Sequence, residues 1–75
     1  KLRAAYEHHD PMPASRFVGR QVVVTQQIAP TGYVRIGSEL WSARGLDRER
    51  IEAGVTVEVV EADGLTLIVK DTRKQ

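Results

Sequence analysis

In the stretch VTVEVVEADGLTLIVK, residues 55–70, apolar and polar residues alternate on both sides of one glycine. Alternation with a period of two is typical of a strand that buries one of its faces. Asp63-Gly64 in the middle is a strong signal for a two-residue hairpin turn. We therefore predict two antiparallel strands, over 55–61 and 65–70. The residues predicted to point inward are Val55, Val57, Val59, Leu65, Leu67 and Val69.

Three strands of the same character are predicted upstream, over 19–28, 33–36 and 39–44. Pro30 and Gly32 suit a type I turn over 29–32, and Gly37-Ser38 suits a type II′ turn that leads into the third strand. Between 45 and 54 the alternation stops. The inward residues are predicted to be Val22, Val24, Val34, Ile36, Trp41 and Ala43.

The segment from Gly45 to Gly54 is predicted to contain one short helical turn. Asp47 is expected to cap this turn, Ile51 to hold the segment against the core, and Gly54 to end the turn. Five short strands with one longer excursion after the third indicate an all-β fold. We predict a small five-stranded OB-like barrel, since closure removes exposed strand edges. An SH3-like barrel stays open as the alternative, because strand count alone does not determine topology.

Length and composition limit what such a chain can do. It has 75 residues, 28% of them charged and 41% hydrophobic, which suits one small globular domain. It contains no cysteine, so disulfides, cysteine-containing zinc sites and thiol nucleophiles are excluded. The longest apolar runs are three residues long, as at 22–24, which predicts no membrane-spanning helix within the chain.

The domain boundaries follow from proline and from polarity. Residues 1–16 include Pro11 and Pro13 and are predicted to be a disordered or extended linker from an upstream region. The barrel is expected over 17–70, and the polar residues 71–75 are expected to form a frayed tail. Because the chain opens on Lys1 rather than methionine, we expect it to be part of a longer protein.

An ordered series of short motifs over about residues 17–70 resembles the C-terminal soluble domain of the NfeD (nodulation formation efficiency D) family. The family often repeats a glycine where this chain has Gln21-Val22, which is the one visible departure. The matching residues are Val18-Gly19, Pro30, Gly32, Val34, Gly37, Glu39, Trp41, Ala43, Ile51, Gly54, Val57, Val59, Gly64, Leu65, Leu67 and Val69.

The resemblance implies an OB-like barrel at the soluble end of a membrane protein whose hydrophobic helices lie upstream. It also implies a partnership with stomatin- or flotillin-like membrane scaffold proteins. Longer members of the family carry a serine protease domain with a Ser–Lys dyad, and none of the residues matched here is a catalytic residue of that family. The function expected is therefore a non-enzymatic protein-interaction module, with self-association as a further mode of assembly.

Sequence features that could carry chemistry are weak. His8-His9-Asp10 lacks the spacing of a zinc site, so we expect no metal. Glu58, Glu61 and Asp63 fall on an outward face and a turn, where carboxylates are solvated rather than catalytic. No glycine-rich phosphate loop links a strand to a helix, and we predict no cofactor.

The outward positions of the predicted strands define a candidate interaction surface. Its members are Tyr33, Arg35, Arg44, Val60 and Ile68. Because OB barrels often bind single strands, a single-stranded nucleic-acid-binding domain is the alternative function. A net charge of +1 and an aromatic content of 5% argue against it.

Basic residues near the start of the chain bear on which side of a membrane the domain lies. Lys1, Arg3, Arg16 and Arg20 all fall within about 20 residues of an upstream membrane exit, the range in which lysine and arginine hold a segment inside. We therefore expect the full-length protein in the cell membrane and this domain on the cytoplasmic side.

Overall fold

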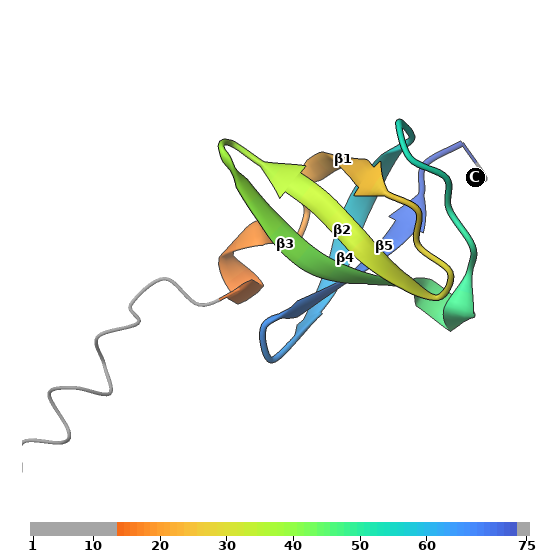
Figure 1. Cartoon of the computed structure of the whole chain (residues 1–75). Coiled ribbons are helices and arrows are strands. Elements are labelled where there is room, and N and C mark those ends of the chain that lie inside the picture. Colours follow the sequence, from red (N-terminus) through yellow and green to blue (C-terminus); the bar gives the residue numbers. More distant parts are fainter. Residues whose placement is uncertain (1–13, 74–75) are drawn as a thin grey trace, which may run out of the picture.

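The computed structural model describes residues 14–73 and shows a closed barrel of five strands with two 3-10 helices (Figure 1). The elements in chain order are η1 (Ala14–Phe17), β1 (Gln21–Gln26), β2 (Thr31–Ile36), β3 (Glu39–Gly45), η2 (Leu46–Arg48), β4 (Thr56–Asp63) and β5 (Thr66–Asp71). The predicted all-β, five-stranded barrel is confirmed.

The order of strands around the barrel is β1-β2-β3-β5-β4, and β4 pairs with β1 to close it. All neighbours are antiparallel except β3 and β5, which are parallel. A parallel pair requires a crossover connection, which here contains η2 and β4. This order is that of an OB barrel, which decides between the two topologies that the strand count left open.

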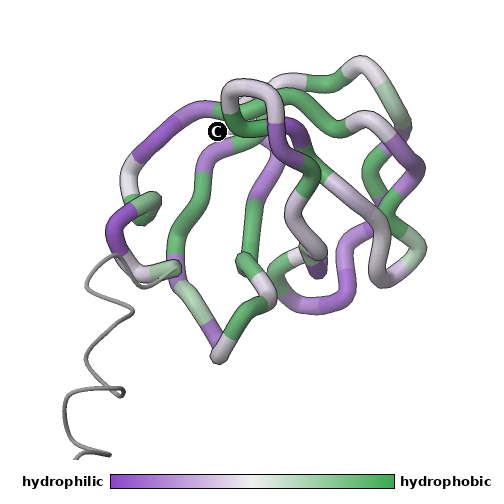
Figure 2. Tube along the Cα trace, turned by 60° about the vertical axis from the view of Figure 1, so that its left-hand side comes forward, coloured by the Kyte–Doolittle hydropathy of each residue, from purple (hydrophilic) through white to green (hydrophobic). Residues whose placement is uncertain are grey.

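The core lies inside the barrel and is built by the inward residues of every strand. Apolar residues recur along the strands in Figure 2, as alternation requires when one face is buried. Ile28 and Ile51 add a bridge between the segments before β2 and before β4. The buried apolar residues of the barrel wall are Val22, Val24, Ile28, Val34, Ile36, Ala43, Ile51, Val57, Val59, Leu67 and Val69.

The barrel is extended at its N-terminal side by η1. Ala14 and Phe17 are buried, and the Phe17 ring lies 5.1 Å from the Trp41 ring in an edge-to-face contact. Gly19 then donates a backbone hydrogen bond of 2.7 Å to Val59 of β4. Packing on the barrel thus already includes Ala14, three residues before the expected start at Phe17. The rest of the predicted linker, residues 1–13, lies outside the described residues.

The sequence pattern predicts that Leu65 points inward. In the structure it lies at the tip of the β4–β5 hairpin and is 71% exposed. Asp63 pairs with Thr66, so the two turn residues are Gly64 and Leu65 rather than Asp63 and Gly64. Gly64 has a φ of 65°, the conformation that the first position of a type II′ turn requires. Gly37 has a similar φ of 64° in the β2–β3 hairpin, where the predicted type II′ turn fits.

Two other local predictions are wrong. Strand β2 already begins at Thr31 and the Ala29–Pro30 peptide bond is cis, so no type I turn spans 29–32. In η2 the cap position is Gly45 rather than Asp47, and no side chain caps the helix. Asp47 itself has a positive φ inside η2, and Gly54 lies in a separate turn before β4 rather than at the end of η2.

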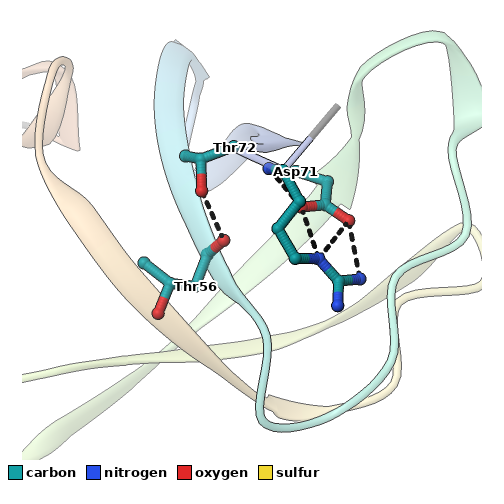
Figure 3. A network of polar contacts seen from close by, with 4 residues as sticks. Thr56, Asp71 and Thr72 are labelled. Carbon is teal, nitrogen blue, oxygen red and sulfur yellow. Dashed lines mark hydrogen bonds and ion pairs between the residues drawn. The ribbon is translucent and has the colours of Figure 1, made fainter. Parts of the chain in front are cut away.

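The C-terminal end of the barrel is held by a small polar network (Figure 3). Asp71 is buried and accepts hydrogen bonds from the backbone N–H of Arg73 at 2.8 Å and from its guanidinium at 2.9 Å. The hydrogen bond to Asp71 raises the pKa of Arg73 above its ordinary value. Thr72 donates to the carbonyl of Thr56 at 3.2 Å. Asp71 and Thr72, expected in the frayed tail, are therefore bound to the barrel, and the exposed Arg73 is held through Asp71. Residues 74–75 lie outside the described residues.

Candidate protein-interaction surface

A largely apolar hollow lies where the first half of β3 faces the β4–β5 hairpin. It has a volume of about 480 Å³ and is lined by Glu39, Leu40, Trp41, Ser42 and Leu65, which we call the Leu40–Leu65 surface. Leu40 is 59% exposed and Leu65 is 71% exposed. The two leucines expose apolar area beside one another, which makes this surface a candidate for association.

Alternation along β3 produces this surface. Leu40 and Ser42 occupy the outward positions, whereas Trp41 and Ala43 point toward the barrel interior. Trp41 was predicted to be a core residue, but it is only partly buried where it packs against the core. Its indole N–H donates to a Glu39 carboxylate oxygen at 3.3 Å. Trp41 therefore supports the core with one part of its ring and lines the surface with another.

Basic side chains border the aromatic pair that supports this surface. The guanidinium of Arg16 lies 4.2 Å from the centre of the Phe17 ring and 5.9 Å from that of Trp41. The guanidinium of Arg20 lies 5.7 Å from the Phe17 ring. Arginine over an aromatic face is held by the ring quadrupole. The contacts of Arg16 and Phe17 with the Trp41 ring join η1 to β3, whereas the contact of Arg20 with Phe17 lies within the N-terminal segment.

The surface proposed from the sequence divides into two separate groups in the structure. Tyr33 and Arg35 lie two residues apart on the outer face of β2, and both are exposed. Arg44 is turned away from them and forms an ion pair of 3.1 Å with Asp63 on the β4–β5 hairpin. Val60 is half-buried on β4. Tyr33 and Arg35 thus remain a candidate surface without the other three residues.

Ile68 is buried and is not an exposed apolar residue, in contrast to the prediction. It lies on β5 between Arg44 of β3 and Glu61 of β4, its partners in the two flanking strands. Long charged side chains cover apolar surface with their stems, which explains why an outward position is inaccessible. Arg44, Glu61 and Ile68 line a polar hollow of about 420 Å³ together with Asp63 and the η2 segment.

The sequence does contain a signal for the exposure of Leu40. Leu40 is the apolar residue at an outward position of a strand whose inward positions, Trp41 and Ala43, were identified. An exposed large apolar residue is informative when another lies beside it. The neighbour is Leu65, which was assigned to the core, so the pair could not be recognised before its exposure was known.

The fold and the surface define a class of protein: an OB-type barrel with an apolar hollow on its outside. Within residues 14–73, no helix is both long and apolar enough to cross a membrane. Residues 14–70 match the family model described as the NfeD-like C-terminal, partner-binding domain. The chain belongs to this family.

Relatives support the same assignment. The chain is 41% identical over 58 residues to the membrane-bound protease PH1510 of Pyrococcus horikoshii, and this match covers 77% of the chain but only 13% of that protein. The C-terminal domain of the stomatin operon partner protein 1510-C from the same organism superposes with a TM-score of 0.73 at 41% identity, over 79% of this chain and 92% of that one.

A second solved structure comes from Corynebacterium glutamicum, where it is described as the soluble domain of a membrane protein implicated in regulation of membrane protease activity. It is 34% identical with a TM-score of 0.67, over 72% of this chain and 89% of that one. Both similar structures are thus single domains, as is the part described here.

Single-stranded nucleic acid is expected not to bind tightly. Tyr33 and Arg35 offer one exposed aromatic ring and one cation on β2, whereas OB domains that bind single strands stack successive bases on several aromatic side chains in a basic groove. Titration of labelled poly-dT, followed by fluorescence anisotropy, should give no complex of micromolar affinity at moderate salt. A salt-sensitive micromolar complex that Tyr33→Ala abolishes would contradict this expectation.

Proposed function

We propose that this domain is a non-enzymatic interaction module that docks a stomatin- or flotillin-like membrane scaffold protein through the Leu40–Leu65 surface. The observation that carries the proposal is the exposed apolar hollow on a member of a partner-binding family. The description of the Pyrococcus horikoshii relative as a stomatin operon partner protein supports this class of partner.

The chemistry of the surface suits protein association better than catalysis. Interfaces are driven by a few apolar or aromatic side chains in a desolvated centre, surrounded by polar groups that exclude water. Leu40, Leu65 and the edge of Trp41 provide such a centre, with Glu39 and Ser42 at its rim. The carboxylates of Glu58, Glu61 and Asp63 are not part of this hollow.

Replacing Leu65 with serine is expected to weaken binding to a purified stomatin-like protein of the same organism by at least about tenfold, the loss typical of an interface hot spot. Leu65 lies at a hairpin tip, so the change should not affect folding. Leu46→Ser is the matched control, because Leu46 is also exposed but lies in η2, outside this surface. Calorimetric titration of both variants measures the difference.

Each result of this titration has a distinct meaning. Equal affinity of the Leu65 and Leu46 variants would remove the Leu40–Leu65 surface from the interface. No binding by the unsubstituted chain would remove stomatin-like proteins as the partner. Sedimentation of the chain alone tests self-association through the same surface, since a dimer that Leu65→Ser dissolves would identify a second copy as the occupant.

We further propose that the domain faces the cytoplasm of a cell whose membrane holds the full-length protein. The support is the set of basic residues near the start of the chain, of which Arg16 and Arg20 are placed beside the Phe17 ring. A protease added to intact cells is expected to leave a C-terminal tag uncut and to cut it after lysis. Cleavage in intact cells would place the domain outside.

A further inference from the structure

Charged residues are distributed unevenly along the folded part of the chain. Residues 14–38 contain three arginines and no aspartate or glutamate, whereas the carboxylate side chains within residues 14–73 all lie in 39–73. The first of these segments folds into η1, β1 and β2, and β1 pairs with β2 in the barrel. Its exposed basic and large apolar residues, which we call the basic face, are Arg16, Val18, Arg20, Val23, Tyr33 and Arg35.

The three arginines of the basic face lie at the same end of the barrel. The guanidinium groups of Arg16 and Arg20 lie 4.2 and 5.7 Å from the centre of one ring, that of Phe17. Arg35 lies across from Val23, which follows Arg20 by three residues, or about 10 Å along a strand. Because β1 and β2 are antiparallel, the start of β1 and the end of β2 lie together, at the end where η1 leads into β1 (Figure 1).

The positive charge of this face is not neutralised by the contacts that hold it. An aromatic ring has no net charge, so the contacts with Phe17 position the guanidinium groups without neutralising them. Among residues 14–73, neither Arg20 nor Arg35 forms an ion pair with a carboxylate. Exposed basic residues that are gathered on one face produce a positive potential there, although the net charge of the whole chain is only +1.

The carboxylates at the borders of the basic face have neighbours of their own. Glu58 of β4 lies across from Gln21 of β1, and on its other side it lies across from Lys70 of β5. Opposite charges at such cross-strand positions interact favourably. Glu39 of β3 accepts a hydrogen bond from the indole of Trp41 at 3.3 Å. The basic face therefore keeps an excess of positive charge.

Apolar side chains lie among these arginines. Val18, Val23 and Tyr33 are each more than 40% exposed. Tyrosine is enriched where proteins meet the interface between membrane and water. Binding of a protein to a bilayer surface becomes stronger with buried apolar area and with attraction to anionic lipids, and the basic face offers both. It differs in this respect from the Leu40–Leu65 surface, which contains no basic residue.

We propose that the basic face lies against the anionic surface of the membrane that holds the full-length protein. This inference goes beyond the docking of a partner, and it rests on the proposed function only for the cytoplasmic position of the domain. The cytoplasmic leaflet carries anionic lipids, which attract basic segments close to a membrane anchor. One relative is a membrane-bound protease, and one similar structure is the soluble domain of a membrane protein.

The position of the basic face suits a tethered domain. The chain enters the barrel at η1, so a membrane segment upstream would hold this face, rather than η2, near the bilayer. A tether raises the local concentration, and weak attraction to lipid is then sufficient to orient the domain. The Leu40–Leu65 surface belongs to β3 and the β4–β5 hairpin, and it borders the basic face without being part of it. It would therefore be presented to a partner on the same membrane.

Sedimentation of the chain with lipid vesicles tests the proposal. At low salt and millimolar lipid, vesicles of equal parts phosphatidylcholine and phosphatidylglycerol are expected to carry the chain into the pellet. Vesicles of phosphatidylcholine alone should not. Because salt screens exposed charges, high salt should release the chain. Absence of binding to the mixed vesicles, or equal binding to both kinds, would overturn the proposal.

Paired variants test whether the basic face makes the contact. Each arginine close to an anionic membrane strengthens binding about fivefold, so the double variant Arg20→Gln and Arg35→Gln should bind roughly thirtyfold more weakly. The double variant Arg48→Gln and Arg50→Gln removes the same charge from exposed positions outside the basic face and should bind like the unsubstituted chain. Equal weakening of both would overturn the assignment to this face.

Thermal unfolding shows whether these variants remain folded. If the change at Arg20 disturbs its contact with Phe17, the single variant Arg35→Gln is still informative, because Arg35 is exposed on β2. This variant should bind the mixed vesicles about fivefold more weakly. Full affinity of a folded Arg35→Gln would overturn its place in the contact.

Competition separates a membrane surface from other sources of phosphate. Glycerol phosphate at millimolar concentration should not release the chain from the mixed vesicles, and release would indicate a site for one phosphate group instead. Displacement by poly-dT at equal phosphate concentration would overturn the proposal in favour of nucleic acid. Leu65→Ser should bind the vesicles like the unsubstituted chain. Since the vesicles contain no protein, failure of the stomatin-like partner to bind would overturn only the proposed function.

Discussion

Phe17→Ala is expected to lower the free energy of unfolding by about 3 kcal/mol, since truncation of a buried phenylalanine typically costs about 3–5 kcal/mol. Phe17 is 4% exposed, and its ring contacts Trp41 at the end of the barrel where η1 covers the core. A domain of this size rarely has more than about 3–5 kcal/mol of stability from a single core. The variant should therefore be largely unfolded at physiological temperature.

Urea unfolding of the variant and of Val18→Ala measures the effect. Val18 is the neighbouring residue and is about half exposed, so its truncation should change stability by less than about 0.5 kcal/mol. Trp41 is the only tryptophan of the chain, and its emission reports the same contact. Its emission should shift to the red in Phe17→Ala under native conditions. An unchanged urea midpoint would show that η1 does not contribute to the stability of the barrel.

The prolines near the start of the chain led to a wrong boundary for the folded domain. Pro11 and Pro13 indicated a linker, and residues 14–16 were assigned to it. Proline is tolerated at the start of a helix, because the donor that it lacks would be unpaired there. Pro13 directly precedes Ala14, so it does not exclude a helix that begins at that residue. Which interpretation applies depends on the contact with Trp41, which is distant in the sequence.

The strand pattern was predictable because one face of each strand is buried. Val57 and Val59 in β4, and Leu67 and Val69 in β5, alternate as a half-buried sheet requires, and all four are buried. Leu65 was assigned wrongly because Asp63-Gly64 and Gly64-Leu65 both suit a two-residue turn, with the glycine in different places. When the turn is shifted by one residue, Leu65 falls within the turn instead of at the start of the following strand.

The candidate site depends on pairings that a local pattern cannot supply. Ile68 is buried because Arg44 and Glu61 flank it from strands that are far away in the sequence. How much of β3 lines the Leu40–Leu65 surface instead of pairing with β5 depends on where the parallel pairing of the two strands begins, which is at Ala43. Parallel pairs are formed by long crossovers, and their register is not determined by a turn. The strands could thus be predicted, but the surface between them could not.

Gly45→Ala is expected to be about as damaging as the loss of Phe17, for a different physical reason. Gly45 is buried at the end of β3, where the chain enters η2 and where its N–H donates to Pro30 at 3.1 Å. A methyl group at Gly45 would overlap the backbone carbonyl oxygen of Glu49 and lie 3.0 Å from its nitrogen and carbonyl carbon. Backbone atoms cannot rotate away as a flexible side chain can.

Overpacking of this kind costs typically about 1–3 kcal/mol and occasionally more, and we expect about 3 kcal/mol here because the obstacle is main chain. For a domain of this size that corresponds to a fall of roughly 12–24 °C in the midpoint of thermal unfolding. Gly37→Ala is the matched variant, since its methyl group would meet nothing within 4 Å and only the φ of 64° opposes it. It should cost about 1–2 kcal/mol. Ser38→Ala, at the exposed neighbouring position, should cost less than about 0.5 kcal/mol.

Thermal unfolding followed by circular dichroism should rank the three variants in that order, with Gly45→Ala the least stable. A midpoint of Gly45→Ala at or above that of Gly37→Ala would show that the turn after β3 can move to accept a side chain.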